Sequence, residues 1–200
     1  MLLDYHIHAA AHGEYRYDYE WLKSFLDTAR RQGIKEVGFA EHDEFVQLID
    51  AKVLAGLRGE YDDVRIRLGL EVDFIPGREP EIAALRNKYD WDYFIGSIHF
   101  IDGWGFDHPD YGYLFEKKDY DQVYEEYFSL VNRMALSGLF DVVGHLDLIK
   151  IWGHRPWRQS TLAYAKPVLH SIKGAGMVIE INSAGLRKPV REIYPAQELL

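Results

Sequence analysis

The chain has 200 residues, of which 48% are hydrophobic and 28% charged, enough for one soluble globular domain with a buried core. Its formal net charge of −9 argues against a protein that binds nucleic acid through the phosphate backbone. Because cysteine is absent, disulfides and thiolate ligands are excluded, and a metal ion would need nitrogen and oxygen ligands.

Short apolar runs alternate with amphipathic segments along the chain. The runs predict strands at residues 2–8, 35–41, 64–74, 91–100, 141–146 and 177–182. The amphipathic segments predict helices at residues 19–32, 47–58, 79–89, 119–136 and 161–174. Residues 102–116, rich in Gly, Asp and aromatic residues, predict a surface loop. This alternation is typical of an α/β protein in which helices connect parallel strands.

The architecture that fits best is a barrel. An open, doubly wound sheet would also give this alternation, but no Gly-rich phosphate-binding turn follows the first strand. Polar residues at the ends of several strands are instead typical of the rim of a (β/α) barrel.

No linker divides residues 1–200, so we expect a single domain. The N-terminus lacks a basic signal region and no apolar stretch is long enough for a membrane span, so we expect a cytoplasmic protein without membrane contacts.

Six histidines and one glutamate stand at or just after the ends of predicted strands. They are His6, His8, His12, His42, Glu71, His99 and His145. His6 and His8 are two residues apart on one strand and therefore point to the same side. Imidazole and carboxylate groups bind zinc, manganese and iron, and a cation relieves the cost of burying several imidazoles together. The pattern predicts a multinuclear metal site, whereas His108, His154 and His170 fit no pattern.

The segments that carry these residues resemble the PHP (polymerase and histidinol phosphatase) superfamily. They are DYHIHAAAH (4–12), GFAEHD (38–43), GLEVD (69–73), DYFIGSIHF (92–100), DVVGHLDLIK (141–150) and EINSAGLRKPVREIYP (180–195). The last two are most similar to histidinol-phosphatases. The resemblance implies a distorted (β/α)7-type barrel with two to three divalent metal ions, zinc, manganese or iron.

The resemblance also implies which residues bind each ion. His6, His8 and Glu71 resemble ligands of the first ion, and Glu71 would bridge to a second ion held by His99 and His145. Glu71, His99 and His145 would form the catalytic centre. His12 and His42 resemble ligands of a third ion. Family members carry a further strand ending in Asp-x-His, which does not follow Asn182 here. We therefore expect about six strands, a C-terminally incomplete barrel, and a bridged pair of sites nearer completion than the third.

Several residues near the predicted ligands are candidates for substrate contact. Arg155 and Arg187 follow rim-proximal strands, match phosphate-contacting positions in similar proteins, and carry the guanidinium group that binds phosphate bidentately. Asp147 would orient a ligand or bind the ammonium group of the substrate. Glu41 and Asp43 flank His42 and are expected to accept hydrogen bonds from ligand ring N–H groups, although Asp43 fits a helix N-cap equally well.

The leading hypothesis is a metal-dependent phosphomonoesterase that hydrolyses L-histidinol phosphate to L-histidinol and phosphate in histidine biosynthesis. Its partners would be a small phosphorylated metabolite and the phosphate product, and not nucleic acid; a homo-oligomer stays open. One alternative is a PHP phosphatase for another small phosphomonoester or for phosphotyrosine. Another is a truncated metal-binding protein without enzymatic activity.

Overall fold

The computed structural model describes residues 2–13 and 16–200, without the side chain of His12. The chain divides into two compact units. The first contains Met1–Val72 and Ala83–Ile95, and the second contains Asp73–Ile82 and Gly96–Leu200. The single domain expected from the sequence stays a prediction. Among the helices of the described residues, none has the length and apolar character needed to cross a membrane.

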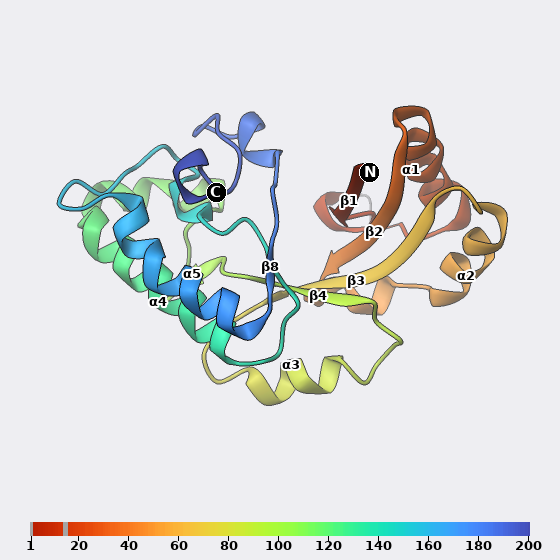
Figure 1. The fold of residues 1–200 in the computed structure, drawn as a ribbon, viewed down its shortest axis with the longest axis horizontal. Helices are drawn as coiled ribbons and strands as arrows, with labels where there is room; N and C mark the ends of the chain where they lie inside the picture. Colours follow the sequence, from red (N-terminus) through yellow and green to blue (C-terminus); the bar gives the residue numbers. More distant parts are fainter. Residues whose placement is uncertain (1, 14–15) are drawn as a thin grey trace. The chain divides into compact units, whose positions relative to one another are not determined.

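Within the described residues, six strands are hydrogen-bonded in the order β1-β2-β3-β4-β7-β8, which confirms the number expected (Figure 1). They are β1 (Leu2–Ile7), β2 (Ile34–His42), β3 (Arg65–Asp73), β4 (Tyr93–Ser97), β7 (Val142–Val143) and β8 (Val178–Ile179). The pairs β1–β2, β2–β3 and β7–β8 are parallel, as predicted. The last two strands are shorter than their apolar runs, which cover residues 141–146 and 177–182.

The helices follow the predicted order, with differences at their ends. They are α1 (Tyr19–Gln32), α2 (Ala51–Glu60), α3 (Glu79–Leu85), α4 (Tyr120–Leu136) and α5 (Thr161–Ala175). Short 3-10 turns are η1 (Ala11–Gly13), η2 (Asp43–Leu48), η3 (Pro109–Lys117), η4 (Leu148–Lys150), η5 (Ala184–Arg187) and η6 (Gln197–Leu199). The helix predicted at 47–58 begins later, because residues 43–48 form η2 and Asp50 caps α2 by accepting from Lys52 N–H. The helix predicted at 79–89 ends early, at Leu85.

In the first unit, α1 shows how local signals set the ends of a helix. The Asp18 side chain accepts a hydrogen bond from the N–H of Trp21 at the N-terminus. At the other end Gly33 has φ of 72°, a left-handed conformation that glycine adopts without strain, and its N–H bonds to the last turn. Leu22, Leu26 and Ala29 form the buried stripe between these caps.

Tyr93 on β4 crosses the neighbouring strands of the first unit. A methyl group added to Gly69 on β3 would lie 2.4 Å from Tyr93 Cζ, and one added to Gly38 on β2 would lie 2.0 Å from its hydroxyl oxygen. That hydroxyl donates to the carbonyl oxygen of Tyr5 on β1. Residues two apart on a strand share a face, so Glu71 lies on the same face as Gly69. The ring of Tyr93 thus packs beside the face that carries Glu71.

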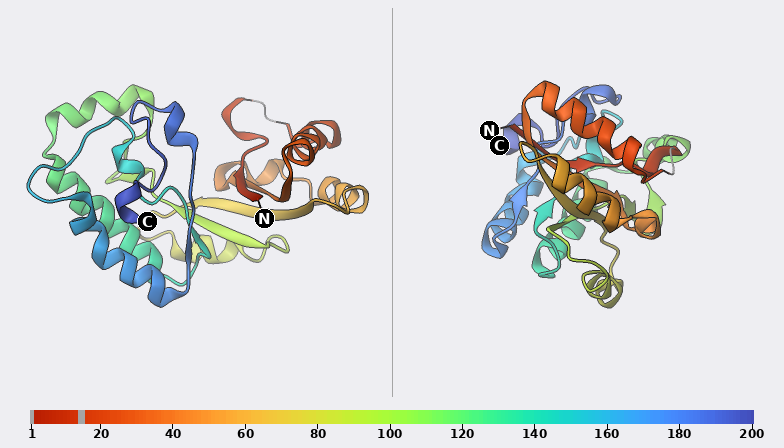
Figure 2. Two further views of the ribbon diagram at one scale, coloured as in Figure 1. Left: turned by 45° about the horizontal axis from the view of Figure 1, so that its top comes forward. Right: turned by 90° about the vertical axis from the view of Figure 1, so that its right-hand side faces the viewer.

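In the second unit, α4 and α5 lie side by side (Figures 1 and 2). Each buries an apolar stripe, including Val131 of α4 and Val168 of α5. The segment predicted as a surface loop, residues 102–116, instead contains the turn of a β-hairpin, its second strand and most of η3. Its Asp102–Gly103 turn has positive φ at both residues and joins β5 (Phe100–Ile101) to β6 (Trp104–Gly105).

Candidate metal centre

The first unit gathers three predicted ligands around the buried carboxylate of Glu71. The Oε2 atom of Glu71 lies 3.1 Å from His6 Nε2, 3.3 Å from His8 Nε2 and 3.2 Å from His42 Nδ1. The Glu71 side chain is only 1% exposed. The strand order explains this convergence, because β1, β2 and β3 are neighbours and His42 stands directly opposite Glu71 in the β2–β3 register.

The imidazole rings of this cluster are in mutual contact. The rings of His8 and His42 are stacked, with centroids 4.4 Å apart and planes 6° apart. The rings of His6 and His8 meet edge to face at 4.9 Å. One ligand atom from each of His6, His8 and Glu71 lies within 4.8 Å of the others, a spacing that could hold a metal ion. The nitrogen and oxygen donors suit zinc, manganese or iron, so the residues fit the predicted group.

Glu41 supports this cluster in a way that the sequence did not predict. We expected its carboxylate to accept from ligand ring N–H groups. Instead it is fully buried and accepts the backbone N–H groups of Ala9, Ala10 and Ala11, at 3.0 Å for Ala10 and 3.1 Å for Ala11. These bonds anchor the turn that follows His8. A charged residue inside the apolar run VGFAEH was the available signal, but its partners lie 30 residues or more away.

The second unit brings together the predicted ligands His99 and His145. Their ring centroids are 5.1 Å apart, and both residues are buried. The Nδ1 atom of His99 contacts Oδ1 of Asp73, a carboxylate at the end of β3 that we had not singled out. The backbone N–H of His145 donates to Glu180 Oε2 at 2.8 Å, which fixes the chain just after β7. Asp73 thus orients the ring of His99, and Glu180 fixes the backbone of His145.

The assignment of all seven residues as metal ligands stays a prediction. The side chain of His12 lies outside the described residues, so its pairing with His42 in a third site is untested. The bridging of Glu71 to an ion held by His99 and His145 is likewise untested, because these residues belong to different units.

The candidate substrate residues occupy different environments in the second unit. Asp147 is fully buried, and its Oδ2 atom lies 2.9 Å from both Lys150 Nζ and Ala196 N. Burial raises the pKa of Asp147, opposed in part by the charge of Lys150. Arg155 is about one-third exposed and pairs with Glu192, whereas Arg187 is exposed at the end of η5.

The histidines outside the pattern have local contacts. The ring of His154 stacks on Phe115 at 4.9 Å and lies 4.7 Å from Tyr120, and burial lowers its pKa. His108 caps η3 by accepting from the N–H of Asp110, and His170 Nδ1 lies 2.8 Å from the carbonyl of Lys166.

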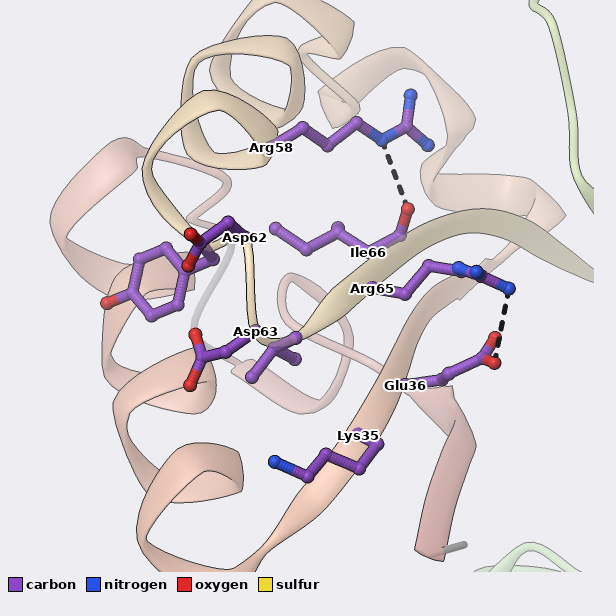
Figure 3. Close-up of a pocket in the computed structure, with 9 residues that line it drawn as sticks. Lys35, Glu36, Arg58, Asp62, Asp63, Arg65 and Ile66 are labelled. Carbon is purple, nitrogen blue, oxygen red and sulfur yellow. Dashed lines mark hydrogen bonds and ion pairs between the residues drawn. The ribbon is translucent and has the colours of Figure 1, made fainter.

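A hollow of about 460 Å³ in the first unit lies at the beginnings of β2 and β3, away from the strand ends that carry the ligands (Figure 3). Among the described residues, its lining contains none of the predicted site residues. Arg65 pairs there with Glu36, and Arg58 donates to the carbonyl of Ile66 (Figure 3). We assign no function to this hollow.

Comparison with known proteins identifies the class. Residues 4–184 match the PHP domain family, so the chain belongs to that family. A probable histidinol-phosphatase from Deinococcus radiodurans is 44% identical over 135 residues, covering 68% of this chain and 51% of the relative. The chain therefore matches about half the length of that curated relative.

Solved structures share the fold. A putative histidinol phosphatase from Listeria monocytogenes superposes with a TM-score of 0.78 at 20% identity, covering 98% of this chain and 88% of the other. A histidinol phosphate phosphatase from Lactococcus lactis, complexed with zinc, L-histidinol and phosphate, gives 0.71 at 20% identity, covering 96% and 77%. These likenesses confirm the predicted α/β fold of PHP type.

Proposed function

We propose that this chain is a metal-dependent phosphomonoesterase that hydrolyses L-histidinol phosphate to L-histidinol and phosphate, a step of histidine biosynthesis. The observation that carries the proposal is the buried Glu71 carboxylate within 3.3 Å of three imidazole nitrogens. Membership of the PHP family and the names of the similar proteins support the choice of reaction and substrate.

The histidines and Glu71 would hold two to three ions of zinc, manganese or iron. His6, His8 and Glu71 would bind the first, and His99 and His145 the second with Glu71 as the shared ligand. His12 and His42 would contribute to a third. When bound, such ions neutralise phosphate charge and lower the pKa of water enough for it to attack phosphorus.

Other side chains would orient the metal ligands or bind the phosphate group of the substrate. Asp73 holds the ring of His99, and Glu41 holds the turn after His8, so the ligands are preorganised. The guanidinium groups of Arg155 and Arg187 would bind the non-bridging oxygens of the phosphate. Asp147 would orient the surrounding chain through its Oδ2 atom, which Lys150 and Ala196 occupy, and would contact the substrate's ammonium only through its buried Oδ1 atom.

A substrate panel tests the reaction. The purified chain, loaded in turn with zinc, manganese or iron, would be assayed with histidinol phosphate, p-nitrophenyl phosphate and a phosphotyrosine peptide. We expect kcat/KM for histidinol phosphate to exceed the others at least about tenfold. A smaller preference would favour another phosphomonoester, and bound metal without phosphate release would favour a metal-binding protein that is not an enzyme.

Single substitutions test the ligands. His99→Ala and His145→Ala should lose activity and bound metal, whereas His170→Ala, which alters an exposed histidine on α5, should retain both. Metal content is measured by mass spectrometry after gel filtration. Full activity in both ligand variants would refute the proposed centre.

A further inference from the structure

The second unit contains a buried ammonium group with three partners. Lys150 is 1% exposed, and its Nζ atom lies 2.7 Å from the carbonyl oxygen of Ile193, 2.9 Å from Asp147 Oδ2 and 3.3 Å from Glu192 Oε2. A buried charge is costly unless it is paired and hydrogen-bonded, so these contacts confine the ammonium group to one position. Its partners come from two segments more than 40 residues apart.

Glu192 extends this contact to Arg155. While its Oε2 atom faces Lys150, its Oε1 atom accepts a hydrogen bond from Arg155 Nη2 at 2.9 Å. The other terminal nitrogen of Arg155, Nη1, donates to the carbonyl oxygen of His154 at 3.3 Å. The guanidinium group is therefore held at both terminal nitrogens, and it remains about one-third exposed.

The loop that carries Glu192 is itself tightly constrained. Asn182 and Tyr194 exchange two backbone hydrogen bonds, of 2.6 and 2.9 Å, which close the loop. A methyl group on Gly185 would lie 2.0 Å from the carbonyl oxygen of Glu192, so only glycine permits this approach. Beyond the loop, the N–H of Ala196 donates to Asp147. The backbone on both sides of Glu192 is thus anchored.

From these contacts we infer that Glu192, supported by Lys150, is a positioning residue that holds the Arg155 guanidinium ready to bind the phosphate group of the substrate. The inference rests on the proposed function, in which Arg155 binds phosphate. An unrestrained arginine loses side-chain rotamer entropy when it binds, whereas a guanidinium that is already fixed loses less. Lys150 and Arg155 together balance the charges of Asp147 and Glu192, so the cluster leaves no unbalanced negative charge beside the phosphate site.

A double-mutant cycle on the zinc-loaded chain of 200 residues tests the inference. Affinity for inorganic phosphate is measured by titration calorimetry for the wild type, Glu192→Gln, Arg155→Met and the double variant, together with KM and kcat for a phosphomonoester. We expect Glu192→Gln to weaken phosphate binding and raise KM about five- to tenfold while kcat stays within about twofold. In the Arg155→Met background the same change should have no further effect, because Glu192 acts through Arg155.

Two controls separate positioning from general stability. Glu198→Gln changes an exposed carboxylate on η6 and should leave phosphate affinity unchanged. Glu192→Asp keeps the charge but is too short to reach both cations, so it should weaken phosphate binding as Glu192→Gln does. It also serves as the second variant if Glu192→Gln fails to fold.

The outcomes distinguish this inference from the proposed function. Unchanged or tighter phosphate binding in the Glu192 variants, or an equal loss with and without Arg155, would overturn the positioning role. Absence of turnover with intact phosphate binding would reject the proposed reaction alone, since the calorimetric comparison still stands. Absence of phosphate binding by the wild type would overturn the inference.

Discussion

The packing of Tyr93 over two glycines can be tested by adding single methyl groups. In Gly38→Ala the new methyl would lie 2.0 Å from the Tyr93 hydroxyl oxygen and 2.9 Å from Cζ. In Gly69→Ala it would lie 2.4 Å from Cζ and 2.5 Å from Cε2. Overpacking of this kind costs about 1–3 kcal/mol, and the lower backbone entropy of alanine offsets about 0.5–1 kcal/mol of it. We expect both variants to be destabilised, by about 1–2 kcal/mol.

Removing the hydroxyl oxygen should relieve only one of the two clashes. Tyr93→Phe alone loses the hydrogen bond to the Tyr5 carbonyl, which costs about 1 kcal/mol. Combined with Gly38→Ala it removes the atom nearest to the new methyl, so the double variant should be about 1 kcal/mol more stable than the sum of the single effects. Combined with Gly69→Ala it removes only the third-nearest atom, at 2.8 Å, and leaves Cζ and Cε2 in place, so the coupling should be clearly smaller than with Gly38→Ala.

Urea unfolding followed by circular dichroism measures these free energies. The slope with denaturant concentration must stay constant across the series for the comparison to hold. Equal coupling of Tyr93→Phe to both glycine variants would refute the proposed packing, because the hydroxyl oxygen is the nearest atom to the methyl at position 38 but only the third-nearest to the methyl at position 69. A stabilising effect of either alanine would refute it as well.

Three further results are expected. Added zinc should raise the melting temperature and chelation should lower it, since a ligand at 100 times its dissociation constant stabilises the native state by about 2.7 kcal/mol; equal melting temperatures would contradict a metal site. Lys150→Met should destabilise the chain by about 3–5 kcal/mol in urea unfolding, because it leaves Asp147 buried without its cation; a loss below about 1 kcal/mol would show that the pair is not buried in solution. Burial would raise the pKa of Asp121, but bonds from Tyr164 and from two backbone N–H groups outweigh it and lower the pKa. Because its pKa is lowered, the ionised Asp121 stabilises the fold at pH values above its unfolded pKa of about 3.9, and this stabilisation is lost as pH falls through the lower pKa of the folded state. The free energy of unfolding should therefore fall less steeply with decreasing pH in Asp121→Asn than in the wild type.

Local sequence patterns were sufficient to predict the α/β fold class and most of the helices and strands. The apolar stripe of α1 and its caps, Asp18 and Gly33, define that helix from neighbouring residues alone. The β5–β6 hairpin was missed although its Asp102–Gly103 turn is a local signal, because the surrounding glycines and aromatic residues favoured a loop.

The candidate site was predictable as a set of residues but not as a set of contacts. The spacing of His6 and His8, and the recurrence of ligand side chains at strand ends, are enough to indicate metal chemistry. The supporting residues carried no such pattern. Glu41 bonds across 30 to 32 residues and Lys150 across 43, and no periodicity of the chain encodes a pairing over that separation.

By itself, the order of residues determined the alternation of strands and helices, the nitrogen and oxygen character of the ligands, and the likeness to the PHP family. Only the tertiary structure decided that Glu71 lies against three imidazoles, that Asp147 forms an ion pair with Lys150, and that Glu192 accepts a hydrogen bond from Arg155. The physical reason is that backbone periodicity depends on neighbouring residues, whereas the partner of a buried charge depends on which distant segments the packed core brings together.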